Sequence, residues 1–588
     1  MSAEWEAAIA AEEAPVVGLP QRGLVLLRAA GAEHAALCRY PSREPLWQPA
    51  GAPTALAVGD NGLWAAVMVS TPDEASRLWL VHTRERRATR MAAAVFRHDA
   101  PVYDPVSGDF LVVSTPEARL YRVMPGRRLR GVCPVPPGER WRLFEGPWGP
   151  LLAISVPGEP TRLRPAPRPV LAPRRSPVPS SWELSLPSVR GVSTLRNHAV
   201  VRSARAARGF DPLTGRVLWE HSAGDARVID ALATPAGVTI AEQREGRPSL
   251  LRLDGAGVTD ARAVELPAWV EGGVVSGLAL HRGEEVLRWE SALEPPRLCR
   301  LDALEASPLA PSDLGHTLRH GVMAEDGAII DVVLSLPPGP ATRRPVLLSC
   351  YGGFGEPHLP VYEPSHAAWV RAGGVVAHAQ IRGGDERGRS WWEQAKGSLK
   401  VRAVWDLSRV VEQLSLHGLP GVPAAPVVLA GGSLGGVVAA ASAFDGRRLC
   451  AGLITTAAPL DLERLNEHPL GSLWLNEFPS SETPEGRAAL RELSPLRRAA
   501  DLPPGHCPPY LGAVMAADAR VGSRDTEELV RLLRSRGLRA RLHVVPCAGH
   551  AANSLSALRR LGAACLSFAA AATGGVVRPT LAPERTPS

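Results

Sequence analysis

Seven short strand-like segments recur through the first half of the chain at nearly constant spacing. They begin at Leu37, Leu78, Leu120, Leu163, Phe210, Leu250 and Leu298. The steps between them are 41, 42, 43, 47, 40 and 48 residues, and basic residues or Gly/Pro turns follow most of the segments. A period of roughly 40–50 residues is typical of one four-stranded propeller blade. The spacing therefore predicts an N-terminal seven-bladed β-propeller, and its regularity disfavours the alternative of a β-sandwich.

One hairpin is especially clear within this region. Residues 211–215 read Asp-Pro-Leu-Thr-Gly and stand between two strand-like flanks, the second of which is Val217-Leu218-Trp219. Proline and glycine at these offsets favour a tight turn. We expect a two-stranded hairpin here.

Turn-forming residues mark a domain boundary at 308–319, where Ser307-Pro308-Leu309-Ala310-Pro311-Ser312-Asp313 stands. We predict that residues 1–310 form the propeller, with a short N-terminal segment included. Residues 311–575 would then form an α/β-hydrolase domain, and 576–588 a disordered tail. At 588 residues and 45% hydrophobic content, the chain is long enough to bury two cores.

The second half alternates strand and helix patterns. An antiparallel hairpin is expected over 321–334 with Asp326-Gly327 at its turn, followed by strands over 346–350 and 374–381. Residues 402–417 carry apolar side chains on one helical face and lead to a strand at 426–429. This order predicts a mostly parallel sheet with helices on both faces.

Ser433 stands in the sequence Gly431-Gly432-Ser433-Leu434-Gly435-Gly436, between that strand and a helix of small residues. A strand, a turn too tight for side chains larger than glycine, and a helix are the parts that expose a nucleophilic serine in an α/β-hydrolase. The alternative is a Gly-rich helix start that packs closely or binds a phosphate. We predict that Ser433 is a nucleophile.

A serine nucleophile needs a histidine base and an acid, and in this fold the acid precedes the histidine in the chain. Asp518 follows the apolar run 510–517, and His550 follows the next strand, 539–546. A helix over 523–536 would connect the two strands. Asp518 and His550 are therefore the candidate acid and base, although Asp518 could also cap a loop.

Two other residues compete for these roles. His543 alternates with apolar neighbours inside the strand, which favours a packed or surface histidine. Asp525 falls in the first turn of the expected helix, where a carboxylate stabilises the helix dipole. Neither is expected to be catalytic.

These residues, taken with further motifs, resemble the C-terminal half of the prolyl oligopeptidase family. The motifs follow the family order over about 200 residues of this sequence: Tyr351-Gly352-Gly353-Phe354, Ile381-Arg382-Gly383-Gly384-Asp385-Glu386-Arg387-Gly388, Gly431–Gly436, Ser494-Pro495-Leu496, Asp518-Ala519-Arg520-Val521 and Ala548-Gly549-His550. The resemblance implies that Ser433, Asp518 and His550 form the catalytic triad. It also implies that a propeller covers the site and admits only short or unfolded peptides.

The resemblance assigns further roles. The Tyr351 hydroxyl and the backbone N–H of Leu434 match the two donors of the family's oxyanion hole. Trp474 matches a tryptophan that stacks on the substrate proline, although a tryptophan of the core is the alternative. Phe354 resembles an aromatic lining of the substrate subsites, and Arg520 matches an arginine that holds a substrate carbonyl. Relatives that cut after basic residues carry acidic groups in this region, and Glu477 keeps that alternative open.

The sequence also departs from the family pattern. Leu434 replaces the usual asparagine, but the donor there is the backbone amide. Ala519 replaces an aspartate beside the triad acid, and Ser523 stands where a proline is usual. Residues 1–15 show no sign of the helical extension that usually wraps the peptidase domain, so we expect no such helix.

The net charge of +7 rests on arginine, since Lys396 and Lys400 are the only lysines. The basic residues are scattered, which disfavours nucleic-acid binding. The eight cysteines are dispersed without a C-x-x-C pair, so neither a zinc site nor a disulfide framework is expected. Cys547 stands close to His550, where a reactive thiol or a packed cysteine would each fit.

The N-terminus is acidic and lacks the pattern of a signal peptide, and no stretch reaches the ~20 apolar residues of a membrane span. Free thiols suit a reducing compartment. We therefore expect a cytoplasmic, monomeric enzyme that needs no metal or organic cofactor and binds neither nucleic acid nor membrane.

These observations together predict a serine oligopeptidase that hydrolyses short peptides, with cleavage after proline favoured. Cleavage after basic residues and esterase activity on the same fold are the enzymatic alternatives. An inactive hydrolase that acts as a binding protein is the alternative from another class, which the intact Ser/Asp/His set disfavours.

Overall fold

The structure is a computed structural model that describes residues 2–70, 76–91, 100–126, 129–167, 182–195, 198–254, 261–306, 312–468, 471–474, 476–550 and 554–580. The chain forms two compact units. One contains residues 15–290 and 296–308, and the other contains residues 1–14, 291–295 and 309–588. The division differs from the predicted one, since residues 1–14 and 291–295, both predicted to belong to the propeller domain, join the C-terminal unit.

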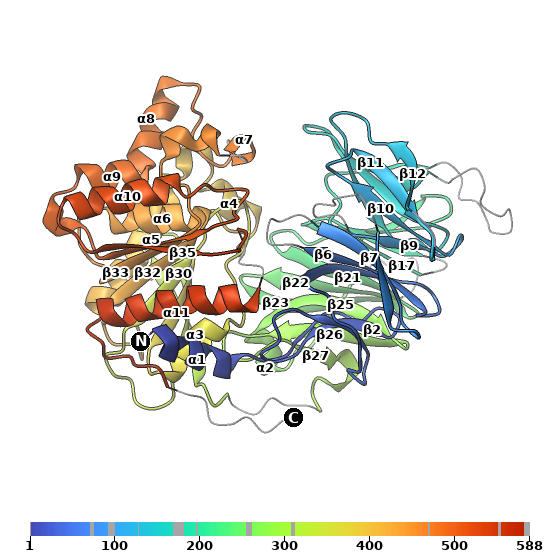
Figure 1. Cartoon of the computed structure of the whole chain (residues 1–588), viewed down its shortest axis with the longest axis horizontal. Helices are drawn as coiled ribbons and strands as arrows, with labels where there is room; N and C mark the ends of the chain where they lie inside the picture. Colours follow the sequence, from blue (N-terminus) through green and yellow to red (C-terminus); the bar gives the residue numbers. More distant parts are fainter. Residues whose placement is uncertain are drawn as a thin grey trace. The chain divides into compact units, whose positions relative to one another are not determined.

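The first unit is a seven-bladed β-propeller of antiparallel sheets (Figure 1). Its first four blades consist of β1 (Val16–Val17), β2 (Leu24–Arg28), β3 (Ala36–Arg39) and β4 (Pro45–Trp47); β5 (Ala52–Val58), β6 (Trp64–Ser70), β7 (Ser76–His82) and β8 (Arg87–Arg90); β9 (Val102–Asp104), β10 (Asp109–Ser114), β11 (Arg119–Val123) and β12 (Leu129–Pro134); and β13 (Arg140–Phe144), β14 (Leu151–Ser155), β15 (Thr161–Pro165) and β16 (Leu184–Leu186).

The remaining blades consist of β17 (Gly191–Thr194), β18 (Ala199–Arg202), β19 (Ala206–Phe210) and β20 (Val217–Ser222); β21 (Arg227–Thr234), β22 (Gly237–Arg244), β23 (Arg247–Asp254) and β24 (Arg262–Val264); and, over its described residues, β25 (Val274–His281), β26 (Glu284–Glu290) and β27 (Arg297–Arg300). The unit also contains α2 (Ala268–Glu271) and a 3-10 turn, η1 (Leu301–Ala303).

The predicted repeat is confirmed in a specific form. All seven segments that set the period fall on the third strand of their blade, namely β3, β7, β11, β15, β19, β23 and β27. The expected hairpin joins β19 to β20, and its turn is held by Asp211, which accepts hydrogen bonds from the Leu213 N–H at 2.8 Å and the Thr214 hydroxyl at 2.9 Å. Gly215 supplies the positive φ of 72° that ends the turn.

The propeller buries its apolar residues between neighbouring blades. One cluster joins Met68 and Leu80 of the second blade to Phe110 and Val112 of the third. Equivalent clusters join the third blade to the fourth, the fourth to the fifth and the fifth to the sixth. A blade cannot bury both its faces alone, so each depends on the next.

The second unit is built on one eight-stranded sheet of order β28-β29-β31-β30-β32-β33-β34-β35. Its strands are β28 (His316–Met323), β29 (Ile329–Leu336), β30 (Val346–Cys350), β31 (Val375–Gln380), β32 (Val427–Gly432), β33 (Gly452–Thr456), β34 (Tyr510–Met515) and β35 (Ala540–Val545). The first pairings are antiparallel, and those from β31 to β35 are parallel. The expected hairpin, helices and parallel strands of a hydrolase are confirmed.

Helices cover both faces of this sheet. They are α1 (Ser2–Glu12), α3 (Pro364–Arg371), α4 (Arg389–Glu393), α5 (Val401–Glu412), α6 (Leu434–Ala443), α7 (Gly471–Trp474), α8 (Pro484–Leu493), α9 (Pro495–Asp501), α10 (Arg524–Ser535) and α11 (Leu555–Ala572), with shorter helical turns at η2 (Gly397–Leu399), η3 (Gln413–His417), η4 (Leu462–Glu467) and η5 (Pro504–His506). Alternate residues of β32 separate the two cores. Val427 and Leu429 pack with α5, α6 and α10, whereas Val428 packs with α1, α3 and α11 (Figure 1).

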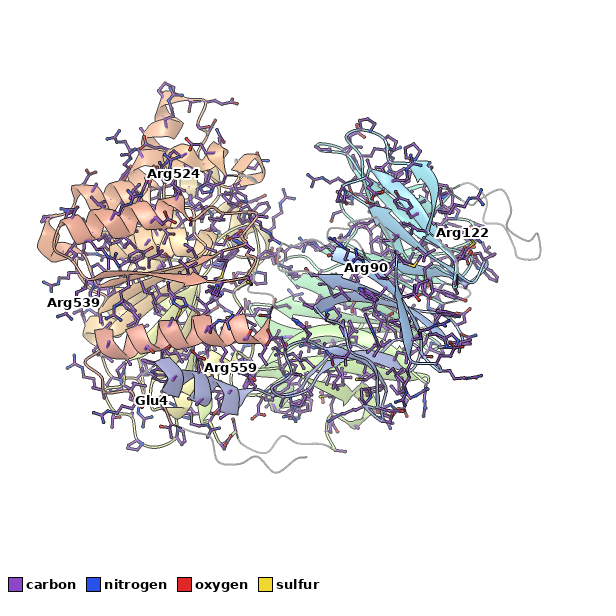
Figure 2. The ribbon with its side chains drawn as sticks, in the orientation of Figure 1. Glu4, Arg90, Arg122, Arg524, Arg539 and Arg559 are labelled. Carbon is purple, nitrogen blue, oxygen red and sulfur yellow. The ribbon has the colours of Figure 1, made fainter. Side chains whose placement is uncertain are left out.

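The prediction that residues 1–15 hold no helix is wrong. Helix α1 packs within the second unit, called the catalytic unit below, where Trp5 is fully buried and stacks on Trp369 at a ring distance of 5.9 Å. Glu12 forms an ion pair with Arg371, and Glu13 accepts hydrogen bonds from Arg559 of α11 at 2.9 and 2.7 Å. Figure 2 labels Arg559 on α11 beside the helix that carries Glu4.

Helix α11 is long and apolar enough, by length and composition, to cross a membrane. Its residues Leu566, Phe568 and Ala569 instead belong to the core shared with α1 and α3. Val577, within the segment predicted to be disordered, is also buried in this core, whereas 581–588 lie outside the described residues.

Candidate active site

Ser433 occupies the sharp turn between β32 and α6. Its backbone has φ 51° and ψ −125°, a conformation that is strained for a residue with a side chain. The Ser433 N–H donates to the carbonyl of Thr456 at 2.8 Å, and the Ser433 carbonyl accepts from the Gly436 N–H at 3.0 Å. The turn therefore holds a half-exposed hydroxyl at the carboxyl edge of the sheet.

The glycines around Ser433 are required by close contacts. A Cβ atom on Gly431 would lie 2.2 Å from the carbonyl oxygen of Gly435, and one on Gly435 would lie 2.5 Å from that of Cys350. A Cβ on Gly436 would lie 2.6 Å from Cβ of Ala458. Close packing thus explains the glycines, but it does not explain a strained serine between them, which is the mark of a nucleophile elbow.

Asp518 and His550 are brought together, although 32 residues separate them. Nδ1 of His550 lies 2.8 Å from Oδ2 of Asp518, and the Asp518 side chain is 2% exposed. The other carboxylate oxygen accepts hydrogen bonds from the N–H groups of Arg520 and Val521 at 2.8 and 3.0 Å. Burial acts to raise the pKa of Asp518, but the hydrogen bonds from His550, Val521 and Arg520 outweigh it and lower the pKa.

The three candidate triad residues follow the carboxyl ends of neighbouring parallel strands. Ser433 follows β32, Asp518 follows β34 and His550 follows β35. Backbone hydrogen bonds link these ends across the sheet: besides the bond from Ser433 to Thr456, the Ala457 N–H donates to Ala513 at 2.9 Å and the Ala517 N–H donates to Ala548 at 2.9 Å. This edge is where open α/β sheets carry their chemistry.

The candidate oxyanion donors lie beside the elbow. A Cβ on Gly435 would meet Cα of Tyr351 at 3.2 Å, and one on Gly353 would meet the Leu434 side chain at 2.5 Å. Burial raises the pKa of Tyr351 to about 12, with added effects of Glu356 and Glu477 and an opposing effect of Arg520. The Tyr351 hydroxyl therefore keeps its proton and can donate a hydrogen bond to an oxyanion.

A buried ion pair that the sequence analysis missed supports this loop. Lys400 and Glu477 are both 2% exposed, and Nζ of Lys400 lies 2.6 Å from Oε1 of Glu477. The same ammonium donates to the carbonyl oxygen of Gly352 at 3.1 Å, and the indole of Trp392 donates to Oε2 of Glu477 at 3.0 Å. Burial lowers the pKa of Lys400, and Glu477 opposes this shift. The one available signal was a lysine in a chain where almost every other basic residue is arginine.

Trp474 ends α7 and is half-buried against the core of the catalytic unit. Its ring lies 5.7 Å from that of His468, whose Nε2 is 3.1 Å from Oδ2 of Asp525. Asp525 is 2% exposed and also accepts from the N–H of Asp461 at 3.1 Å and from Arg464 at 3.2 Å. The helix-dipole explanation of Asp525 is therefore incomplete, because its carboxylate also contacts Asp461, Arg464 and His468 in the segment that precedes Trp474.

The other candidate substrate contacts also lie in the catalytic unit. Phe354 has a positive φ of 57° and packs, half-buried, against the core. Arg520 lies two residues after Asp518 in the loop, and its charge acts to lower the pKa of Tyr351. The competing residue His543 is half-buried in β35, where burial lowers its pKa.

No group of three or more His, Cys, Asp or Glu side chains among the described residues could hold a metal ion. All eight cysteines are free thiols, and Cys547 is exposed in the loop that carries His550.

Comparison with known proteins finds a family match within the second unit. Residues 361–575 match the family model described as the prolyl oligopeptidase family. An uncharacterized peptidase of Rickettsia prowazekii is 30% identical over 157 residues, which is 26% of this chain and 21% of the relative. The prolyl endopeptidase of Elizabethkingia meningoseptica is 27% identical over 161 residues, which is 27% of this chain and 23% of the relative. These alignments thus span only about a fifth of each relative's length.

Solved structures resemble the chain over nearly its whole length. A structure from a study of two prolyl endopeptidases has a TM-score of 0.78 at 17% identity and covers 98% of this chain and 92% of its own. Oligopeptidase B from Leishmania major has a TM-score of 0.75 at 14% identity and covers 98% of this chain and 90% of its own. At such identities these structures show the shared fold. The match over residues 361–575 relates the second unit of this chain, rather than the whole chain, to the prolyl oligopeptidase family.

Proposed function

We propose that the protein is a serine oligopeptidase that hydrolyses short peptides, with cleavage after proline. The observations that carry the proposal are a strained Ser433 after β32 and a hydrogen-bonded Asp518–His550 pair after β34 and β35, all at the carboxyl ends of parallel strands of one sheet. Curated relatives named prolyl endopeptidase and the family match add support.

In the proposed reaction, Oγ of Ser433 attacks the carbonyl carbon of the peptide bond while Nε2 of His550 takes the hydroxyl proton. Asp518 accepts the Nδ1–H of the imidazole, which fixes the tautomer and stabilises the imidazolium. His550 then returns the proton to the leaving amine as the C–N bond breaks. Water attacks the acyl-enzyme by the same route and releases the carboxylate product and free Ser433.

The negative charge on the carbonyl oxygen would be stabilised by the Tyr351 hydroxyl and the N–H of Leu434. Such donors contribute roughly 3–4 kcal/mol each to stabilisation of the transition state. The raised pKa of Tyr351 supports this role, because a phenol that stays protonated remains a donor throughout catalysis.

Cleavage after proline is favoured over cleavage after basic residues because of Glu477. Its two carboxylate oxygens contact Lys400 and Trp392 and it is 2% exposed, so it is poorly suited to bind a substrate cation. Trp474 offers a half-buried ring suited to the flat pyrrolidine of proline, which has no N–H to satisfy.

We further propose that the enzyme is a cytoplasmic monomer without a metal or organic cofactor. Eight free thiols support a reducing compartment. Hydrolysis by a serine, a histidine and an aspartate needs no added group.

A fluorophosphonate probe tests the catalytic assignment. We expect the native chain to be labelled at Ser433, Ser433→Ala to be unlabelled, and Asp518→Asn to react much more slowly. A native chain that resists labelling, or a Ser433→Ala variant that is still labelled, would refute the assignment.

Matched peptides that differ only in the residue before the scissile bond test the specificity. We expect higher kcat/KM for Pro than for Arg or Ala, and a loss of this preference in Trp474→Ala but not in Trp474→Phe, which keeps a flat ring. Equal preference in the native enzyme and Trp474→Ala would remove Trp474 from the proline site.

A further inference from the structure

His468 stands at the junction between η4 and α7, beside the candidate proline-stacking residue. It caps the end of η4, and its carbonyl accepts the Gly471 N–H at 2.9 Å where α7 begins. A Cβ on Gly471 would lie 1.9 Å from the carbonyl oxygen of Leu465, so the glycine allows α7 to pack directly on η4. One close-packed segment therefore carries both His468 and Trp474.

The imidazole of His468 contacts a carboxylate and an indole. The His468 side chain is 8% exposed, and its Nε2 lies 3.1 Å from Oδ2 of Asp525, in the first turn of α10. The centroid of the His468 ring lies 5.7 Å from that of the Trp474 ring, and the two ring planes are tilted by 40°. His468 thus connects a buried carboxylate to the ring of Trp474.

Asp525 is itself fixed by charged and polar groups of η4. It accepts hydrogen bonds from the Asp461 N–H at 3.1 Å and from Nη2 of Arg464 at 3.2 Å. Arg464 in turn forms ion pairs with Glu528 at 2.6 Å and with Asp461 at 3.0 Å. Hydrogen-bonded networks in a buried environment rigidify the groups that they join. The carboxylate of Asp525 therefore restrains where the imidazole of His468 can lie.

Trp474 is restrained at its backbone by a different contact. Its carbonyl accepts the N–H of Glu477 at 2.8 Å, whereas its side chain is only half-buried. A half-buried ring can occupy more than one rotamer unless its neighbours exclude the others. Aromatic rings favour offset or tilted arrangements, and such a contact adds to the energy of burial. The ring of His468 makes a contact of this kind with Trp474.

We propose that His468 is a specificity-determining positioning residue, which holds the Trp474 ring in the orientation that meets the proline of the substrate. Asp525 fixes the imidazole, and the imidazole fixes the indole. The inference rests on the proposed function in taking Trp474 as the surface that contacts proline. Loss of His468 should therefore weaken the binding of a proline peptide without slowing the chemistry at Ser433.

Steady-state kinetics on two matched peptides, with Pro or Ala before the scissile bond, test the inference. We expect His468→Ala to lower the ratio of the two kcat/KM values about fivefold, which is the effect of losing one aromatic contact. The loss should lie mainly in the KM of the Pro peptide, because binding of the substrate and of the transition state weaken together. The rate of fluorophosphonate labelling should stay unchanged.

Three further variants separate positioning from packing. His468→Gln keeps a side-chain N–H near the place of Nε2, so it should retain more of the preference than His468→Ala. His468→Leu fills the space without a hydrogen bond to Asp525; it should lose the preference, and it gives the same test if His468→Ala does not fold. The matched control is Glu528→Ala, which removes a carboxylate of the same network that pairs with Arg464 and Arg524. It should lower the urea midpoint and leave the ratio unchanged.

A spectroscopic measurement gives a readout that is independent of catalysis. In protein labelled with fluorotryptophan, the fluorine resonance of Trp474 is the one that disappears in Trp474→Phe. This resonance should shift or broaden in His468→Ala and keep its position in Glu528→Ala. An unmoved resonance in His468→Ala, or an equal loss of the preference in Glu528→Ala, would overturn the inference.

The outcomes distinguish the inference from the proposed function. If the native enzyme prefers Pro and His468→Ala keeps that preference, the proposed function stands and the role of His468 in specificity is overturned. If the native enzyme shows no preference for Pro, the proline proposal falls, and a moved resonance would still show that His468 positions Trp474.

Discussion

The ammonium of Lys400 lies 2.6 Å from the carboxylate of Glu477, and both groups are buried in the catalytic unit. Lys400 also holds the carbonyl of Gly352, next to Tyr351, while the backbone N–H of Glu477 donates to the carbonyl of Trp474 at 2.8 Å. One ion pair therefore connects the candidate oxyanion donor to the candidate proline-stacking residue. We regard Lys400 and Glu477 as positioning residues.

Replacement of Lys400 by methionine should destabilise the catalytic unit. Removing one partner of a buried pair leaves an uncompensated charge and costs about 3–5 kcal/mol. The measurement is urea unfolding followed by tryptophan fluorescence. The double variant Lys400→Met/Glu477→Gln should recover part of the lost stability because no charge is left unpaired. The control is Lys396→Met, which removes the cation lying 4.4 Å from the Trp392 ring centroid and should destabilise the unit much less. Equal losses in Lys400→Met and Lys396→Met would contradict this account.

Tyr351→Phe should lower kcat and leave KM nearly unchanged. The hydroxyl acts on the oxyanion, which exists only along the reaction path, and loss of one such donor lowers kcat about 10²–10³-fold. Steady-state kinetics on one proline peptide measure the effect. A change confined to KM would mean that Tyr351 contributes to substrate binding instead.

Two neighbouring glycines provide a steric test of the elbow. Gly435→Ala places a Cβ 2.5 Å from the Cys350 carbonyl, next to Tyr351, whereas a Cβ on Gly432 has its nearest neighbour, the Thr456 carbonyl, at 3.8 Å. We expect Gly435→Ala to lose at least about 10²-fold in kcat, since small misplacements of catalytic groups carry that cost. Gly432→Ala should lose only a few-fold, and the rate of fluorophosphonate labelling should follow the same order. Similar losses in both variants would show that the contact at Gly435 is not limiting.

The stability of the catalytic unit should fall as the pH drops below about 6.5 because of His378. This residue of β31 is 2% exposed, and burial, together with His358 and His366, lowers its pKa well below 6.5. Glu363, 3.6 Å from His366, and Glu386, which accepts from the His358 N–H at 2.6 Å, are the carboxylates facing this group. The unfolded chain takes up a proton near pH 6.5 while the folded chain does not, so protonation favours unfolding.

The measurement for His378 is the urea midpoint from pH 8 to pH 5 for the native chain and His378→Phe. The native midpoint should be highest above about pH 6.5 and decline below it, and the decline should be smaller in the variant. Parallel curves for the two proteins would exclude His378 as the cause.

Local patterns predicted the repeated and consecutive parts of this molecule. The seven segments that set the repeat lie on equivalent strands because every blade repeats one strand order. The Ser433 turn was recognisable because its strand, glycines and helix are contiguous in the sequence. The roles of Ser433, Asp518 and His550 remain predictions, although the contact between the last two is observed.

Features that depend on residues far apart in the chain could not be predicted from the sequence. Helix α1 carries three glutamates and shows no clear apolar face. Glu12, which ends it, and Glu13, which follows it, form ion pairs with Arg371 and Arg559, hundreds of residues away. Lys400 and Glu477 are likewise 77 positions apart. From the sequence alone, a charged residue is expected at the surface, because its burial depends on a partner that local patterns do not identify.

The pairing of α1 with α11 has a consequence for synthesis of the protein. Trp5 is synthesised more than five hundred residues before α11, yet part of the surface that covers it comes from this helix. The seven blades lie between α1 and α11 in the sequence, so the propeller can fold before the catalytic unit is complete. A nascent chain truncated ahead of Leu555 would carry all seven blades but would lack the part of the apolar cover of Trp5 that α11 supplies.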